Sequence, residues 1–193
     1  MVNASSQKGM LAINGMSYHD RASGFANSGI IVSVGPEDYE DRGVLSGMYF
    51  QEELERKTFE LCGGKIPVCY LEDFLLKREG KVDRCFDNAI KGSYSGADVY
   101  GLLPEFVSST IAEGMNAFGR KIKGFDRGDT LILASETRTS SPVRIVRGED
   151  YQSLSIKGLY PCGEGAGYAG GITSACVDGI KVALAICGPD MIK

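Results

Sequence analysis

A glycine-rich stretch, GEGAGYAGG at residues 163–171, has the composition and spacing of a phosphate-binding turn. It follows the apolar run LYPC, which predicts a strand at 159–162, and it precedes an amphipathic segment that predicts a helix from about Gly170. Free N–H groups and the positive end of a helix dipole then meet at one point, and glycine lets a ligand approach the backbone because it has no Cβ. This stretch, called the glycine turn below, is therefore a candidate anion-binding site.

The glycine turn is not a complete dinucleotide-binding unit. Such a unit needs a second strand and an acidic residue about 20 positions after the glycines. Asp190 stands near that position, but the few residues after it are too short to form the strand. Two interpretations therefore remain open: Gly165, Gly167, Gly170 and Gly171 either serve a ligand or only let a strand pack tightly against the helix.

Glu164 favours a binding role for the glycine turn. A carboxylate beside a helix N-terminus can cap that helix, or it can accept hydrogen bonds from the hydroxyl groups of a sugar-like ligand. Either role places Glu164 among the candidate site residues.

A second candidate stretch is SETRTSSPVRIVR at residues 135–147. Arg138 and Arg144 flank Ser140 and Ser141, so that a loop rich in hydroxyl groups lies between two guanidinium groups. Arginine suits planar ligands that carry oxygen because its donors form a rigid fork. The alternative is a hairpin with solvated charges, in which Ser-Ser-Pro forms the turn.

A third group of polar side chains lies near the N-terminus and could line a polar cleft. Asparagine and serine are also ordinary turn residues, so this group is open to a purely structural interpretation. The single histidine has no visible partner for the role of a general base, and we assign no catalytic residue. The members of the group are Asn3, Ser5, Ser6, Asn14, His19 and Arg21.

Composition excludes several function classes. The net charge is −4 and no long basic cluster occurs, so nucleic-acid binding has little electrostatic support. The apolar run 172–187 is too short to span a bilayer and carries Asp178 and Lys181. The start of the chain does not have the pattern of a secretory signal, and the six cysteines form no C-x-x-C pair. We therefore expect a cytoplasmic protein with reduced, packed thiols and no metal site.

Hydrophobic periodicity predicts a mixed α and β chain with 43% apolar residues. Strands are expected at 29–34, 131–134 and 143–146, with a hairpin turn at Asn14-Gly15. Three helices are expected: the first spans 47–62, with Phe50, Leu54 and Leu61 on its apolar face and glycines at its C-terminal cap; the second spans about 70–80; and the third starts near Pro104. The polar region 81–97 is expected to be a loop.

Two long motifs resemble the C-terminal part of a family of bacterial FAD-dependent dehydrogenases, usually described as uncharacterised NAD(P)/FAD-dependent oxidoreductases. The motifs are ETRTSSPVRI and IKGLYPCGEGAGYAGGITSACVDGIKVALAI. Earlier blocks, VNASS, INGMSY, ANSGIIVSV and FQEELERKTFELCGG, are similar to the same family, so the resemblance covers nearly the whole chain. Members of the family are more than twice this long and carry the glycine motif for the ADP half of FAD in a region that this chain lacks.

The resemblance implies specific roles for the two motifs. Gly163 and Glu164 would hold the ribityl and pyrophosphate region of FAD, beside Gly165. Gly170, Gly171 and Ile172 would offer N–H groups near the flavin O2 and N1 atoms, where the helix dipole can stabilise negative charge. Four residues of the other motif would face the flavin or the substrate cavity; they are Arg138, Ser140, Ser141 and Arg144.

The expected fold is α+β. Residues 1–150 would form a substrate or cap domain with a mixed or antiparallel sheet and about three helices. Residues 151–193 would supply a strand, the glycine turn and a helix to an incomplete Rossmann-like FAD domain. Because the first βαβ unit is absent, we interpret the chain as a fragment, made either by the choice of its boundary or by truncation of the gene product at Met1.

The expected function belongs to the full-length protein. It is a flavin-dependent oxidoreductase that transfers hydride between FAD and a small-molecule substrate, with NAD(P)H as a candidate second partner. One alternative is a non-catalytic module that binds an anion or a phosphate at the glycine turn. Another is a folding unit that forms a homo-oligomer through the face that the missing part would cover.

Overall fold

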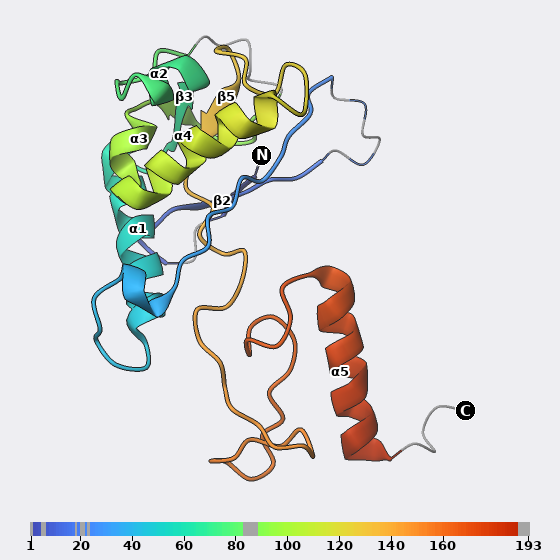
Figure 1. Cartoon of the computed structure of the whole chain (residues 1–193). Coiled ribbons are helices and arrows are strands. Elements are labelled where there is room, and N and C mark those ends of the chain that lie inside the picture. The colour runs from blue at the N-terminus through green and yellow to red at the C-terminus, as the bar shows by residue number, and fades with distance from the viewer. Residues whose placement is uncertain are drawn as a thin grey trace. The chain divides into compact units, whose positions relative to one another are not determined.

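The computed structural model describes residues 2–4, 7–17, 19, 22, 24–82 and 89–188, and it divides the chain into two compact units (Figure 1). Unit 1 comprises Met1–Asp38 and Phe50–Thr137. Unit 2 comprises Tyr39–Tyr49 and Arg138–Lys193. Each unit is described separately below.

A mixed three-stranded sheet organises unit 1. Its central strand is β3 (Ile66–Tyr70), which pairs in parallel with β4 (Tyr94–Gly96) and antiparallel with β5 (Leu131–Leu133). The first four residues of β3 are buried, as expected for a strand with neighbours on both edges. The mixed sheet and the helices around it confirm the α+β class. The sequence analysis predicted only β5 of these three strands.

The described helices exceed the predicted number because a short α-helix at Val99–Leu102 and a 3-10 turn at Pro36–Asp38 were not predicted, and the second predicted helix, at 70–80, is confirmed over a shorter range. The helices are α1 (Ser46–Cys62), α2 (Leu71–Leu75), α3 (Val99–Leu102), α4 (Glu105–Gly119) and α5 (Ile172–Cys187), with a 3-10 turn, η1, at Pro36–Asp38. As predicted, α4 begins after Pro104 and α1 ends in glycines. Gly63 and Gly64 both have positive φ, and the Gly64 N–H donates to the Phe59 carbonyl, which closes α1 with a Schellman-type cap.

The hydrophobic core of unit 1 has two clusters. The first gathers side chains of β3 and the helices that follow it: Cys69, Leu71, Phe74, Val99, Tyr100, Leu102, Met115 and Ala134. The second joins the N-terminal segment to β3: Leu11, Ile13, Ile66, Val68 and Ile90. The predicted apolar face of α1 is correct only in part: Phe50 and Leu54 are half-buried, but Leu61 is exposed, and the buried positions of the central turns are Glu55 and Thr58. Among the described residues, no helix has the length and hydropathy required to cross a bilayer.

One predicted strand in unit 1 and its predicted hairpin turn differ from the structure. A strand pair does form near the N-terminus, but β1 (Val2–Ala4) pairs with β2 (Ala12–Asn14), so the connection precedes Asn14 instead of following it. Residues 29–34 pair with no described strand. Ile30 packs against the core while Ile31 is exposed, so the alternating pattern reflects burial of an extended segment without a ladder.

The two strands predicted for unit 2 are also absent from its described residues. At 143–146 the backbone bonds to the glycine turn and to side chains, for example from the Ile145 N–H to the Ala166 carbonyl (3.2 Å). At 159–162 the Leu159 carbonyl accepts from Ser153 (2.8 Å) and the Pro161 carbonyl accepts from the Arg147 guanidinium (2.6 Å). These partners replace the neighbouring strand that a ladder requires.

The core of unit 1 generates a stability prediction. Phe74 is fully buried on α2 and its ring lies 5.1 Å from that of Tyr100, whereas Leu76, directly after α2, is 62% exposed. Replacing Phe74 by Ala should lower the free energy of unfolding by about 3–5 kcal/mol, because it leaves a cavity. The matched control, Leu76→Ala, should change it by less than about 0.5 kcal/mol. Urea unfolding followed by circular dichroism measures both, and equal losses would contradict this assignment of the core.

Candidate functional site

The two candidate motifs of the sequence analysis meet in unit 2. The Ser141 hydroxyl lies 3.1 Å from the Gly165 carbonyl, to which it can donate, and 2.8 Å from the Val143 carbonyl. The Arg144 Nε donates to the Gly167 carbonyl at 2.9 Å. The structure therefore brings Ser141 and Arg144 together with the glycine turn, and both side chains contact its backbone.

Two glycines of the turn are required by the fold itself. Gly163 and Gly167 have φ angles of +71° and +82°, a conformation that residues with a side chain rarely adopt. A Cβ added at Gly167 would lie 2.5 Å from the Val143 carbonyl oxygen, so the backbone of the neighbouring motif fills that space. The Gly167 N–H also donates to the Glu164 carbonyl at 2.9 Å. These contacts explain Gly167 without any ligand.

Gly165 and Gly170 differ from these two. Neither has a φ in the left-handed region, and a Cβ added at either position would meet no atom within 4 Å. Neither backbone conformation nor packing within the described chain requires glycine there. The open backbone at Gly165 and Gly170 is therefore where another molecule could approach closely.

The start of α5 leaves some of the predicted N–H donors available. Gly171 is the N-cap, and its N–H donates to the Ser174 hydroxyl (3.2 Å), half of a capping box. The N–H groups of Gly170 and Ile172 donate to no described residue. Ile172 itself is 93% exposed. Of the three donors predicted here, the structure leaves two free within its described part and commits the third to Ser174.

Glu164 does not cap the helix. It is exposed and stands well before the N-cap, and its carboxylate accepts no hydrogen bond from the described part of the chain. Of the two roles proposed from the sequence, capping is therefore wrong. The other role, accepting hydrogen bonds from a ligand, remains a prediction.

Arg147 and Asp178 form an ion pair that the sequence analysis missed. The guanidinium donates through both terminal nitrogens to the carboxylate, at 2.6 and 3.0 Å, with side chains only 9% and 13% exposed. Asp178 also accepts from the Gly163 N–H at 2.9 Å. The Arg147 hydrogen bonds, together with a smaller contribution from the Gly163 N–H, lower the pKa of the Asp178 carboxyl to about 2.

Two tyrosines flank the Arg147 guanidinium. Its central carbon lies 3.7 Å from the ring centroid of Tyr168 and 4.8 Å from that of Tyr151. The Tyr168 hydroxyl accepts from the backbone N–H of Arg147 and donates to the Ile145 carbonyl, both at 3.1 Å. The sequence analysis singled out Arg138 and Arg144 as the two important arginines and passed over Arg147. A signal for Arg147 was present, because Arg147 and Tyr168 lie within the same two motifs.

The hydrogen bonds and ion pairs given above for the glycine turn do not involve the other predicted residues. Arg138 and Ser140 are exposed in unit 2. In unit 1, Asn14 and His19 are exposed. The remaining members of the polar N-terminal group lie wholly or in their side chains outside the described residues: Asn3, Ser5, Ser6 and Arg21.

A buried polar network on α1 fixes the start of the SETRTSS motif in unit 1. Glu55 is 1% exposed, and its carboxylate accepts from the Thr137 hydroxyl at 2.8 Å. The Gln51 amide donates to the Thr137 carbonyl at 2.8 Å. One turn further along α1, the Thr58 and Ser135 hydroxyls lie 2.7 Å apart. Polar residues spaced i, i+4 and i+7 on one helix face were the signal for this network.

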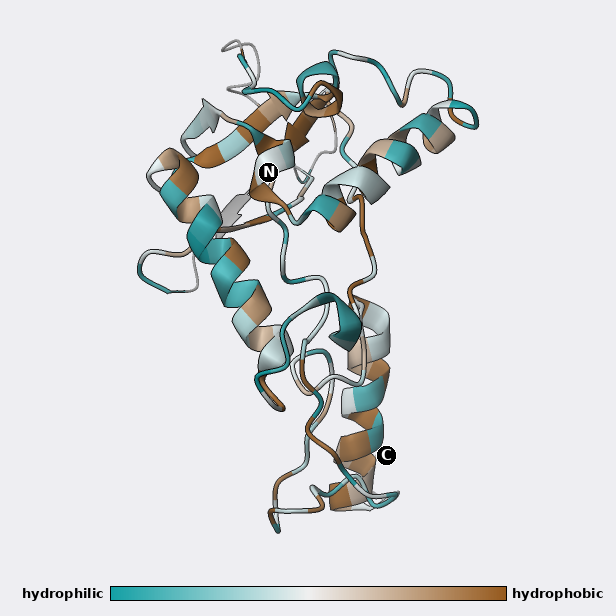
Figure 2. Ribbon diagram, turned by 60° about the vertical axis from the view of Figure 1, so that its left-hand side comes forward, coloured by the Kyte–Doolittle hydropathy of each residue, from teal (hydrophilic) through white to brown (hydrophobic). Residues whose placement is uncertain are grey.

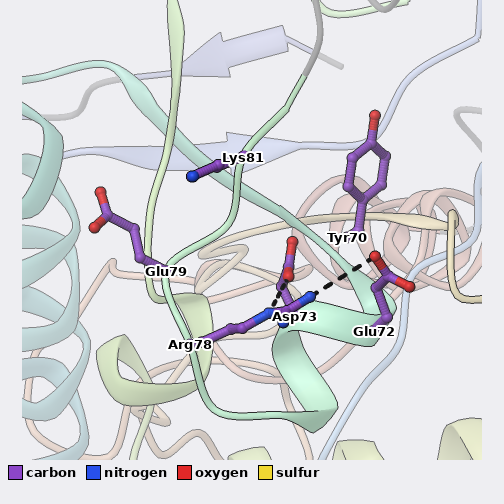
Figure 3. Close-up of a pocket in the computed structure, with 6 residues that line it drawn as sticks. All are labelled: Tyr70, Glu72, Asp73, Arg78, Glu79 and Lys81. Carbon is purple, nitrogen blue, oxygen red and sulfur yellow. Dashed lines mark hydrogen bonds and ion pairs between the residues drawn. The ribbon is translucent and has the colours of Figure 1, made fainter.

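A cavity of about 380 Å³ lies at the end of β3 (Figure 3), lined by Tyr70, Glu72, Asp73, Arg78, Glu79 and Lys81. Arg78 occupies its centre. It donates to the largely buried Asp73 carboxylate at 2.5 Å and lies 3.9 Å from Glu72. Arg78 is therefore paired within the cavity, whereas Glu79 and Lys81 are exposed and form no ion pair with another residue that lines it.

The cysteines show no reactive arrangement in the described chain. Burial raises the pKa of the Cys69 thiol to about 12, which makes it a poor nucleophile. Cys162, Cys176 and Cys187 are exposed, so the prediction of packed thiols is wrong for these three. Among the described residues, histidine, cysteine and acidic side chains form no cluster of three that could hold a metal ion.

The α1 network generates a second stability prediction. Glu55→Ala should lower the free energy of unfolding by about 1–3 kcal/mol, because it leaves the Thr137 hydroxyl without its buried acceptor. Glu60→Ala, at an exposed position of the same helix, is the control and should be close to neutral. Thermal and urea unfolding of both variants provide the comparison. A neutral Glu55→Ala would show that the network does not hold the motif.

The Asp178 pKa predicts how unit 2 responds to acid. Since its folded value of about 2 lies below the ordinary 3.8, the stabilisation is complete above the ordinary pKa and is lost as the pH falls through about 2. Carbon-detected NMR titration of the Asp178 carboxyl should give a midpoint near 2, and Arg147→Lys should raise it. A midpoint near 3.8 in the unsubstituted chain would contradict the ion pair.

Comparison with known proteins identifies the family. A family model described as FAD-dependent protein, C-terminal domain-like, matches residues 1–139. An uncharacterized protein of Clostridium beijerinckii (strain ATCC 51743 / NCIMB 8052) is 45% identical over 186 residues, which is 95% of this chain and 35% of the relative. At that coverage the similarity extends beyond residue 139 into the glycine turn. The chain belongs to the family of FAD-dependent proteins, as part of their C-terminal domain.

Proposed function

We propose that this chain is the C-terminal part of a flavin-dependent oxidoreductase that transfers hydride between FAD and a small-molecule substrate. The family match and the length of the relative, of which the chain spans 35%, support this proposal. The term parent protein below means a chain that carries these 193 residues and has the length of the relative. NAD(P)H is the proposed second partner, since a flavin can exchange hydride with a nicotinamide.

The observation that carries the proposal is the open backbone of the glycine turn. Gly165 and Gly170 border open space, and the N–H groups of Gly170 and Ile172 have no described partner at the start of a 16-residue helix. Neutral N–H donors beside a positive helix end fit the electron-rich pyrimidine edge of a flavin. The residues present therefore fit the cofactor that the family implies.

Each part of the turn has a distinct role in this proposal. FAD, when bound, would supply the hydride acceptor or donor. Gly170 and Ile172 would donate to the flavin edge, and the exposed Glu164 would accept from the ribityl hydroxyls. Gly163 would shape the turn through its positive φ, with its N–H committed to Asp178.

The second motif divides into two pairs. Ser141 and Arg144 contact the carbonyls of the glycine turn, so we assign them to its support. Arg138 and Ser140 are exposed, and we propose that they face the flavin or the substrate. The substrate class that this pair would suit is a small molecule bearing oxygen, since arginine donates to such groups in a planar fork.

The surface of α5 supports a place inside a larger domain. Figure 2 shows apolar residues around much of this helix, and the exposed ones include Ile172, Val177, Ile180 and Ile186, whereas Val182 is buried. A helix that is apolar on more than one side is typical of a protein interior. We propose that the rest of the parent covers it, so that 151–193 complete the FAD domain and 1–150 form a substrate or cap domain.

The two classes of glycine generate the test of this function. In the parent protein, Gly165→Ala and Gly170→Ala should fold normally but weaken FAD binding about tenfold or more, because a methyl group would hold the flavin off its backbone donors. Gly167→Ala is the contrasting variant. It should lower the free energy of unfolding by about 2 kcal/mol or more, through its positive φ and the clash with Val143.

Flavin absorbance during FAD titration, together with urea unfolding, separates these outcomes. Unchanged FAD affinity in both Gly165→Ala and Gly170→Ala would contradict the flavin role of the turn. A parent protein that binds phosphate but remains colourless with FAD would instead favour the anion-binding module. Light scattering of the 193-residue chain tests whether it self-associates when the rest of the parent is missing.

A further inference from the structure

The Arg147–Asp178 pair connects four separate segments of unit 2. Arg147 is the last residue of the SETRTSSPVRIVR stretch, and Asp178 lies in the second turn of α5. Beyond the carboxylate, the guanidinium donates to the Pro161 carbonyl at 2.6 Å and stacks on Tyr168 at 3.7 Å. Asp178 in turn accepts from the Gly163 N–H. The pair therefore holds the glycine turn on both sides and fixes it to α5.

Apolar packing in unit 2 contributes little to the shape of this turn. Among its described residues, the buried apolar side chains larger than alanine are Pro161 and Val182. Apolar packing is also non-directional, so it sets the position of a loop less sharply than a bidentate ion pair does. Directional bonds therefore set the backbone geometry at Gly163: its N–H donates to Asp178, which Arg147 holds, and its carbonyl accepts from the Tyr168 N–H at 3.0 Å.

Stability alone does not explain why an ion pair, instead of two apolar side chains, occupies this position. Two apolar side chains of similar volume often stabilise a protein as well as a buried ion pair does, because desolvation offsets the attraction of the charges. What the pair adds is geometry. Both Asp178 oxygens accept from Arg147, and one of them also accepts from Gly163, so the rotation of α5 and the path of the turn are set together.

We propose that Asp178, held by Arg147, is the positioning residue that sets the glycine turn against the start of α5 for flavin binding. This inference rests on the proposed function. Neither side chain needs to touch the flavin; they act through the backbone between Gly163 and Ile172. The consequence is that replacing Asp178 should weaken FAD binding even in a protein that remains folded.

The test uses Asp178→Asn in the parent protein, with Glu149→Gln as the control. Asparagine keeps the size of the side chain but loses its charge and one of its acceptor oxygens. Glu149 is exposed in the same unit, so its substitution removes a charge without disturbing the turn. The expected result is a fall in FAD affinity of about tenfold, from the loss of one charge-assisted hydrogen bond, with a changed flavin absorbance spectrum.

Amide hydrogen exchange supplies a readout that does not depend on bound flavin. In Asp178→Asn the Gly163 amide should exchange faster, while amides of the unit 1 core keep their protection. Arg147→Lys should reproduce both effects, since lysine cannot donate through a planar fork. If Asp178→Asn fails to fold, Arg147→Lys carries the same comparison.

The outcomes distinguish this inference from the proposed function. Weaker FAD binding by a variant that is still fully folded at the assay temperature supports the positioning role. A lower melting temperature with FAD affinity and spectrum unchanged overturns it and leaves the proposed function intact. An unsubstituted parent protein that binds no FAD overturns both.

Discussion

Arg147 donates hydrogen bonds to a backbone carbonyl and to a carboxylate in unit 2, whose described residues contain no strand. Residues 159–162 follow an extended path without a neighbouring ladder, so their polar groups need partners from elsewhere. The guanidinium donates to the Pro161 carbonyl and to the Asp178 carboxylate, and the rings of Tyr168 and Tyr151 pack against it. One side chain thereby determines how the glycine turn meets α5.

The glycines of the turn fall into two classes that the spacing of the motif does not distinguish: those that the fold requires and those that it does not. Gly167 is glycine because the Val143 carbonyl leaves no room for a Cβ and because its φ is positive. Gly165 and Gly170 have neither reason within the described chain. The spacing of the motif is therefore partly a folding requirement, and the two glycines that the fold does not require are the ones that we propose for the ligand.

Sequence patterns predicted the elements whose stabilisation is local. The helices α1 and α4 were found because capping residues and apolar spacing lie within the segments themselves. The central strand β3 was missed: it is short, and its five residues form a continuous apolar run instead of an alternating one. The predicted strand at 143–146 failed for a related reason, because strand formation depends on a partner that local sequence does not specify.

The candidate site was predicted to a similar degree. Both motifs were recognised and the structure brings them together, through contacts of Ser141 and Arg144 with the turn. The pair that holds them, Arg147 with Asp178, was missed because its members lie 31 positions apart, on a loop and a helix. Glu55 was missed because a glutamate on an amphipathic helix is usually exposed, whereas here it is buried against Thr137.

The most direct test of the central claim is amide hydrogen exchange of the parent protein with and without FAD. The account predicts that the amides of Gly170 and Ile172, which have no partner in the described chain, become protected when FAD binds. The Gly163 amide, already bonded to Asp178, should change little. Saturating FAD with no protection at Gly170 and Ile172 would show that the flavin binds elsewhere and would contradict the assignment of this turn.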